Sequence, residues 1–168
     1  EGRNAVWLAT QGWEVTGVDF SAVGLRKAAN LAEANRVTGL WITHDVTSWT
    51  PIVRYDLAVV FYLQLVAAER RAALAVAARS LAPGGTLLVV AHDLANLTDG
   101  VGGPQDAAVL YTPDDVVADL AASGVDDLDI ERAERVERSV PRSDGTLAPA
   151  IDCLVAVGGV SWSSLCGG

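Results

Sequence analysis

The sequence predicts an α/β fold, a doubly wound and mainly parallel sheet with a C-terminal antiparallel hairpin. Two observations predict it. Short apolar runs alternate with stretches of helical periodicity up to about residue 91, as in consecutive βα units. The segment Tyr55–Leu65 (YDLAVVFYLQL) is apolar almost throughout, as expected of a strand buried on both faces of a parallel sheet. We expect one domain over residues 1–157 and an unstructured tail over 158–168.

The first elements follow from periodicity. Residues 1–11 place their apolar side chains on one face, which predicts a helix that Gly12 ends. The β-branched run Val15–Asp19 is the next strand. Ala22–Arg36 then repeats apolar residues at helical spacing, with charges on the other side. Gly39–Thr43 follows as a short strand.

A third helix, a buried strand and a long loop come next. Ala67–Leu81 is rich in Ala, Leu and Arg, and a Pro-Gly-Gly turn at 83–85 ends this helix. Thr86–Ala91 (TLLVVA) is the strand. Asp93–Leu110 contains glycines, a proline and few apolar anchors, which predicts a long loop at the carboxyl side of the sheet. Loops of that length in compact domains are usually functional.

The last elements are one helix and a hairpin. Thr112 as N-cap, Pro113 at the first helical position and two acids in the first turn predict a helix over 112–122. Leu128–Val140 alternates acidic and basic residues, which indicates a strand, although a charged helix fits the same alternation. After a Ser-Asp-Gly turn, Leu147–Val157 is a second strand, and the two form an antiparallel pair at the sheet edge.

The composition of the chain excludes several classes of function. The 168 residues carry a net charge of −9, which leaves no basic surface for nucleic acid or an anionic membrane. No apolar run spans a bilayer and no signal peptide is present, so we expect a cytoplasmic protein. Cys153 and Cys166 form neither a disulfide framework nor a metal site. The single lysine, Lys27, has no phosphate-loop glycines before it, which excludes a Walker A site.

The first candidate ligand-binding residue is the acid that ends the predicted strand Val15–Asp19. Asp19 ends a buried strand, and Ser21 opens the helix that follows. Ligands of open α/β sheets bind at the carboxyl ends of the strands, where an acid can accept two hydrogen bonds from a ribose diol. The alternative is that Asp19 only caps the helix.

The order of these elements, from Glu1 to about Val157, resembles that of class I S-adenosylmethionine-dependent methyltransferases, which have a Rossmann-like sheet. EGRNAVWLATQGWEVTGVDFS is similar to small-molecule methyltransferases of the tellurite-resistance and thiopurine type, whose glycine-rich loop continues directly into Glu-Gly-Arg-Asn. The resemblance implies S-adenosyl-L-methionine as cofactor and in-line methyl transfer to a small-molecule nucleophile. It implies cofactor contacts by Gly2, Arg3, Asn4, Asp19, Phe20, Ser21, Asp45, Val46, Phe61 and Tyr62.

The resemblance also assigns roles to these residues. Gly2 is the last glycine of the loop, so the amides at the start of the first helix face the methionine carboxylate. Asp19 binds the ribose diol and Phe20 flanks the adenosine. Asp45 and the amide of Val46 meet the adenine.

Phe61 and Tyr62, by the same resemblance, lie beside the reacting sulfonium. Structural alternatives remain: Arg3 as a surface cation, Asp45 as a loop cap and Phe61 as plain core. In the resembled family, a central strand precedes the glycine loop and is absent from this sequence, which also has no methionine. We therefore expect an N-terminally truncated domain whose flanking strands lack a backbone partner.

Catalytic candidates cluster after the strand Thr86–Ala91. His92 is our first choice as general base, the alternative being a strand-end histidine bonded to backbone. Gln64, Asp93 and Tyr111 are candidate substrate contacts. His44 and His92 follow unrelated strands and make a weak ligand set, so no metal is expected.

Two other functions stay open at this point. An acid ending the second strand also serves a ribose in nicotinamide-dependent oxidoreductases, which need a catalytic Tyr with a nearby Lys. None of Tyr55, Tyr62 and Tyr111 has a lysine in the following turn. The second alternative is an inactive cofactor-binding relic or a partner-binding module. The oligomeric state is left open.

Overall fold

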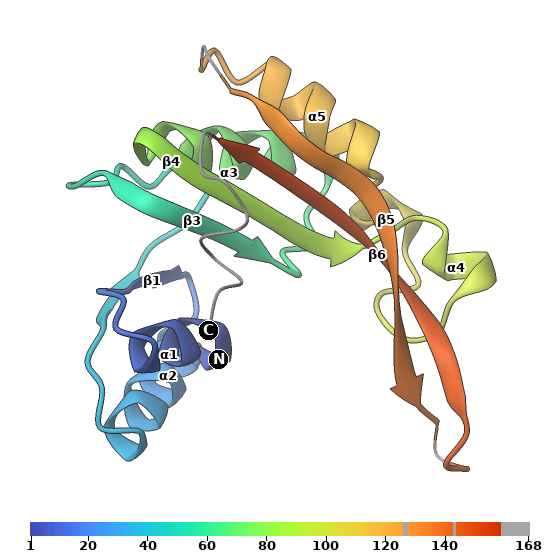
Figure 1. The fold of residues 1–168 in the computed structure, drawn as a ribbon, viewed down its shortest axis with the longest axis horizontal. Helices are drawn as coiled ribbons and strands as arrows, with labels where there is room; N and C mark the ends of the chain where they lie inside the picture. Colours follow the sequence, from blue (N-terminus) through green and yellow to red (C-terminus); the bar gives the residue numbers. More distant parts are fainter. Residues whose placement is uncertain (126–127, 143, 159–168) are drawn as a thin grey trace. The chain divides into compact units, whose positions relative to one another are not determined.

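The computed structural model describes residues 1–125, 128–142 and 144–158 (Figure 1). The chain divides into two compact units between Trp49 and Thr50. We call them the N-terminal unit and the C-terminal unit and describe each by itself. The tail predicted at 158–168 lies outside the described residues except for Gly158, which ends a strand.

The N-terminal unit contains the two helices and the two short strands that the periodicity predicts, and the strands form a two-stranded parallel sheet. Its elements are α1 (Arg3–Thr10), β1 (Thr16–Asp19), α2 (Ala22–Ala34) and β2 (Leu40–Thr43). Because β1 and β2 are parallel, with Asp19 opposite Thr43, both strands end at the same edge of the sheet. The residues that follow the two strands therefore share that edge.

A glycine permits the close approach of the two helices in this unit. Gly2 has a φ of 84°, in the left-handed region that favours glycine. A β-carbon at Gly2 would lie 2.4 Å from the β-carbon of Ala28 on α2. Only a glycine therefore lets α1 begin this close to α2.

The C-terminal unit is built on a four-stranded mixed sheet. Its elements are β3 (Tyr55–Phe61), α3 (Ala67–Arg79), β4 (Leu81–His92), α4 (Asn96–Asp99), the 3-10 turn η1 (Ala107–Val109), α5 (Pro113–Ala121), β5 (Ile130–Pro141) and β6 (Leu147–Gly158). The strand order is β3-β4-β6-β5, in which β3 is parallel to β4 and the other neighbours are antiparallel. The predicted C-terminal hairpin is confirmed, and the charged segment is a strand rather than a helix.

Three predicted boundaries differ from the structure. The strand expected to reach Leu65 ends at Phe61, because Tyr62 has a φ of 54° and turns the chain out of the sheet. β4 begins at Leu81 rather than Thr86, because Leu81 pairs with Tyr55. The predicted loop at 93–110 includes α4 and η1, short turns that aspartate side chains stabilise.

The core of the C-terminal unit lies on one face of its sheet, under α3 and α5 (Figure 1). The sheet contributes alternate residues of β4 and β6 to it: Leu87, Val89, Ala91, Cys153, Val155 and Val157. Burial raises the pKa of the Cys153 thiol to about 12, so this thiol is a packing group and not a nucleophile. Since successive side chains of a strand point to opposite faces, His92 and Asp152 lie on the face away from α3 and α5.

A buried ion pair joins the two helices over this core. The Nε atom of Arg70 on α3 lies 2.7 Å from Oδ2 of Asp119 on α5, and both side chains are less than a tenth exposed. Arg71, which is more than half exposed, contacts the other oxygen of Asp119 at 3.1 Å. The guanidinium of Arg70 also stacks 4.8 Å from the ring centre of Tyr111. This charge cluster fixes how α3 and α5 pack.

Candidate active site

At the carboxyl edge of the N-terminal sheet, Asp19 has one oxygen engaged and one available. Its Oδ1 accepts a hydrogen bond of 2.8 Å from the Ser21 amide, and Ser21 in turn caps α2 by accepting from the Gly24 amide. The N-cap of α2 is therefore Ser21, and Asp19 contacts the turn before the helix without capping it. Among the described residues, Asp19 Oδ2 has no hydrogen-bond donor, which leaves it for a hydroxyl of a ligand.

Two further groups lie at the same edge. Phe20 is 80% exposed, an unusual state for a large aromatic ring and one that suits contact with a planar base. Asp45 accepts hydrogen bonds from the amide and the hydroxyl of Thr47, at 2.8 and 2.7 Å. Both hydrogen bonds lower the pKa of Asp45, and the bond from the backbone amide has the larger effect. The two bonds thus keep Asp45 charged. Val46 follows directly and is half-buried.

The start of α1 offers backbone donors. Gly2 occupies the N-cap position, and no side chain caps the helix. The first amides of a helix lack partners within it, and together with the helix dipole they favour an anion. Arg3 and Asn4 are exposed at this end. The N-terminal unit therefore has residues that fit a ligand with a ribose diol, a planar base and a carboxylate.

In the C-terminal unit, three polar side chains meet around Asp152 on β6. Oδ2 of Asp152 accepts from the Tyr62 hydroxyl at 2.9 Å and from Nε of Arg138 at 2.6 Å. Oδ1 lies 3.3 Å from Nδ1 of His92. The rings of Tyr62 and His92 are 4.9 Å apart, and the Arg138 guanidinium lies 5.7 Å from the Tyr62 ring centre. We call these four residues the Asp152 cluster.

The electrostatics of the Asp152 cluster favour a neutral imidazole. Burial is the main cause that lowers the pKa of His92, and the Arg138 charge lowers it further, whereas Asp152 raises it. Burial and the hydrogen bond to Asp152 raise the pKa of Tyr62, which therefore stays a phenol. At neutral pH the cluster thus presents an unprotonated histidine beside the carboxyl group of Asp152.

A glycine of the loop after β4 packs against the imidazole. The buried Asn96 ties this loop to β6, since its Oδ1 accepts from the Ile151 amide at 2.8 Å and its Nδ2 donates to the Gly102 carbonyl at 2.7 Å. Gly103 has a φ of 74°, and a β-carbon there would lie 2.8 Å from the His92 ring. The loop therefore shields one side of His92 from water.

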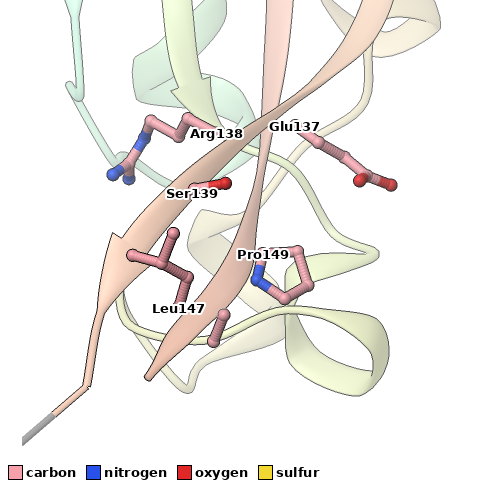
Figure 2. A pocket seen from close by; sticks show the side chains of 6 residues that line it. Glu137, Arg138, Ser139, Leu147 and Pro149 are labelled. Atoms are coloured by element: carbon pink, nitrogen blue, oxygen red, sulfur yellow. The ribbon is translucent and has the colours of Figure 1, made fainter. Parts of the chain in front are cut away.

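A shallow hollow of about 430 Å³ borders the Asp152 cluster through Arg138 (Figure 2). It is lined by Glu137, Arg138, Ser139, Leu147, Ala148 and Pro149. Figure 2 shows Glu137 and Arg138 projecting to opposite sides of β5. Arg138 is therefore shared between this open surface and the carboxylate of Asp152.

The three predicted substrate contacts have structural partners. The Gln64 amide donates to the Val109 carbonyl at 2.6 Å and accepts from the His92 amide at 3.0 Å. Asp93 is fully buried and paired with Arg135 at 2.9 Å, on the face opposite to His92. The buried Tyr111 donates to the Leu63 carbonyl at 3.0 Å. A substrate role for Gln64, Asp93 and Tyr111 stays a prediction.

The structure groups the other predicted residues by unit. Gly2, Arg3, Asn4, Asp19, Phe20, Ser21, Asp45 and Val46 lie in the N-terminal unit, and Phe61, Tyr62 and His92 lie in the C-terminal unit. Sequence reasoning missed Asp152 and Arg138. One signal pointed to Asp152, the only acidic residue in the apolar run Leu147–Val157.

Two wider properties of the described part of the chain bear on function. It contains no group of three or more histidine, cysteine or acidic residues placed to hold a metal ion. None of its helices combines the length and the apolar character needed to cross a membrane.

Comparisons with known proteins show which proteins this chain resembles. A family model described as "Methyltransferase domain" matches residues 1–85, half of the chain. No curated protein matches the chain. Three solved structures share its fold at low identity. TehB from Haemophilus influenzae has a TM-score of 0.72 and 15% identity, over 95% of this chain and 54% of TehB.

The second neighbour is the N-methyltransferase NodS from Bradyrhizobium japonicum, solved with S-adenosyl-L-homocysteine. It has a TM-score of 0.64 and 19% identity, over 95% of this chain and 74% of NodS. The third, from work on the conversion of a disulfide bond into a thioacetal group during echinomycin biosynthesis, has a TM-score of 0.69 and 18% identity. That match covers 98% of this chain and 75% of the other.

Proposed function

Since the chain belongs to the methyltransferase domain family, we propose that it transfers a methyl group from S-adenosyl-L-methionine to a small-molecule nucleophile by in-line displacement. The observation that carries the proposal is the family match over residues 1–85, which spans α1 to α3 and includes the strand ends at Asp19 and Asp45. The complex of the neighbour NodS with S-adenosyl-L-homocysteine supports this choice of cofactor. The family match gives the nicotinamide alternative no support.

The features of the N-terminal unit support specific cofactor contacts. The available oxygen of Asp19 binds the ribose diol, and the exposed ring of Phe20 covers the adenosine. Asp45 and the Val46 amide recognise the adenine edge. The uncapped start of α1, at Gly2, binds the methionine carboxylate through backbone amides. Arg3, Asn4 and Ser21 complete this set, and cofactor contacts by Phe61 and Tyr62 are part of the same proposal.

The cofactor supplies an electrophilic methyl group on a sulfonium. The acceptor would take this methyl group through a lone pair, with the carbon–sulfur electron pair left on sulfur, and the residues of the chain would align the acceptor with the sulfonium. The proton of the acceptor goes to His92, which is unprotonated at neutral pH because burial lowers its pKa. The chain thus contributes alignment of the two reactants and one proton acceptor.

The remaining parts of the proposal concern context. We propose that residues 1–157 act together as one methyltransferase domain in the cytoplasm. The net charge of −9 argues for a small-molecule acceptor rather than nucleic acid or a membrane surface. An activity assay with candidate acceptors identifies the small molecule that accepts the methyl group.

Replacing His92 by glutamine tests the proposed base. With methyl-labelled S-adenosyl-L-methionine and a panel of small amines, thiols and phenols, we expect the native chain to label at least one acceptor. The His92→Gln variant should lower that rate about 10²- to 10⁴-fold, the usual contribution of a general base. Mass spectrometry measures the amount of labelled acceptor. The variant Glu69→Gln, at an exposed position, serves as the control. Equal rates for His92→Gln and native protein would remove His92 from this role. Cofactor binding without labelling of any acceptor would support the relic alternative.

A further inference from the structure

Among the buried polar atoms of the C-terminal unit that have no hydrogen-bond partner in the described part of the chain, two face each other. They are Nδ1 of His92 and Oδ1 of Asp152, 3.3 Å apart. Buried polar atoms without partners are rare and cost stability. At 3.3 Å the two atoms lie within reach of each other but are not aligned as a hydrogen bond. A small rotation of the imidazole with a proton on Nδ1 gives each atom the other as its partner, because the ring nitrogen then donates to the carboxylate.

The backbone places these two atoms together. His92 and Asp152 are directly paired in the antiparallel ladder of β4 and β6, so their side chains leave the same face of the sheet. Asp152 is only 1% exposed. Strand register therefore places the two side chains next to each other, and burial restricts the conformations that Asp152 can adopt.

The second oxygen of Asp152 determines which oxygen faces the histidine. Oδ2 is occupied by two donors, the Tyr62 hydroxyl at 2.9 Å and Arg138 Nε at 2.6 Å. With both donors on one side of the carboxylate, Oδ1 is left for His92. The charge of Arg138 also compensates the buried carboxylate, which would otherwise be costly to keep ionised.

We propose that Asp152 is a positioning residue for the general base, and that it holds the proton of neutral His92 on Nδ1 so that Nε2 is free to accept the proton of the methyl acceptor. This inference rests on the proposed function for the role of His92. Arg138 and Tyr62 orient Asp152 through its second oxygen. When His92 takes up a proton, Nδ1–H continues to donate to Asp152, and the carboxylate stabilises the imidazolium.

Long-range nitrogen–proton NMR of the imidazole rings tests the proposal without cofactor or acceptor. The chain has two histidines, so a His44→Gln background leaves His92 as the single ring signal. We expect the proton of neutral His92 on Nδ1. A proton on Nε2 in the native sequence would overturn the proposal, and this measurement needs no change at the cluster. Because no methyl transfer is measured, its failure leaves the proposed function standing.

The variant Asp152→Asn is expected to move the proton. The donors Tyr62 and Arg138 require an oxygen at the Oδ2 position, so the new amide nitrogen faces His92 and donates to Nδ1. The histidine proton then moves to Nε2, with a change in the tautomer ratio of about tenfold or more, the value of one net hydrogen bond. An unchanged tautomer in folded Asp152→Asn would overturn the proposal.

The variant Arg138→Gln provides an independent arm, since this side chain is 43% exposed and its loss is tolerated more easily. In the part of the chain that the structure describes, Asp152 and Arg138 are the charged groups that shift the pKa of His92, and the Tyr62 ring lies 4.9 Å from the imidazole. Removing the Arg138 charge should raise the pKa of His92, whereas removing the Asp152 charge should lower it. Shifts in the same direction for both variants would contradict the arrangement.

Discussion

Replacing Asp19 by alanine is expected to weaken the binding of S-adenosyl-L-homocysteine about a hundredfold or more, measured by calorimetric titration. In the proposed complex, the carboxylate accepts two hydrogen bonds from the ribose diol. Hydrogen bonds to charged groups contribute roughly 1.5–3 kcal/mol each, and a loss of about 2.8 kcal/mol is a hundredfold in affinity. No other residue proposed for the N-terminal site offers the same pair of interactions.

Two further variants separate recognition from the local turn. Asp19 also accepts from the Ser21 amide, so Asp19→Ala disturbs the start of α2 as well. Asp19→Asn retains an oxygen for that amide and loses the charge, so it should lower affinity with little change in thermal stability. Glu33→Ala, an exposed acid on α2, serves as the matched control. Native affinity in folded Asp19→Ala would show that the ribose is bound elsewhere.

Replacing Asp119 by asparagine is expected to lower the free energy of unfolding by about 3–5 kcal/mol, the range measured when one partner of a buried ion pair is removed. Arg70 would keep its charge in a site where its side chain is only 9% exposed. The loss also disturbs the packing of α3 on α5, where Arg70 stacks on Tyr111. Urea unfolding followed by circular dichroism gives the value.

Arg71 is the matched control for this prediction because it contacts the same carboxylate from a position that is 56% exposed. Exposed ion pairs contribute about 0–1 kcal/mol, so Arg71→Gln should cost no more than that. Losses of similar size for Asp119→Asn and Arg71→Gln would show that burial of Arg70 does not control the stability of the pair.

The elements that local patterns define were predictable. Helical periodicity and capping identified α2 and α5. The predicted N-cap Thr112 is confirmed, and the structure adds a capping box between Thr112 and Asp115. The strand boundaries were not predictable from local patterns, because they depend on partners that are distant in the sequence. β4 begins at Leu81 because Tyr55 pairs with it, and β3 ends where Tyr62 adopts a positive φ. Neither fact is encoded in the few residues around the boundary.

The candidate site was partly predictable for the same reason. Strand ends identify Asp19, Asp45 and His92, because polar residues that follow buried strands are recognisable in one sequence. The partners of His92 come from β5 and β6, and only the strand register shows that Asp152 lies directly opposite it. The alternation of side chains along a strand also separates His92 from its neighbour Asp93, because the two side chains point to opposite faces of the sheet.

The central claim is that this chain binds the methyl-donor cofactor, and calorimetric titration of the native protein tests it most directly. We expect micromolar binding of S-adenosyl-L-homocysteine and no binding of the reduced nicotinamide cofactor under the same conditions. Binding of the nicotinamide cofactor, or no binding of either ligand by a chain that circular dichroism shows to be folded, would contradict the claim.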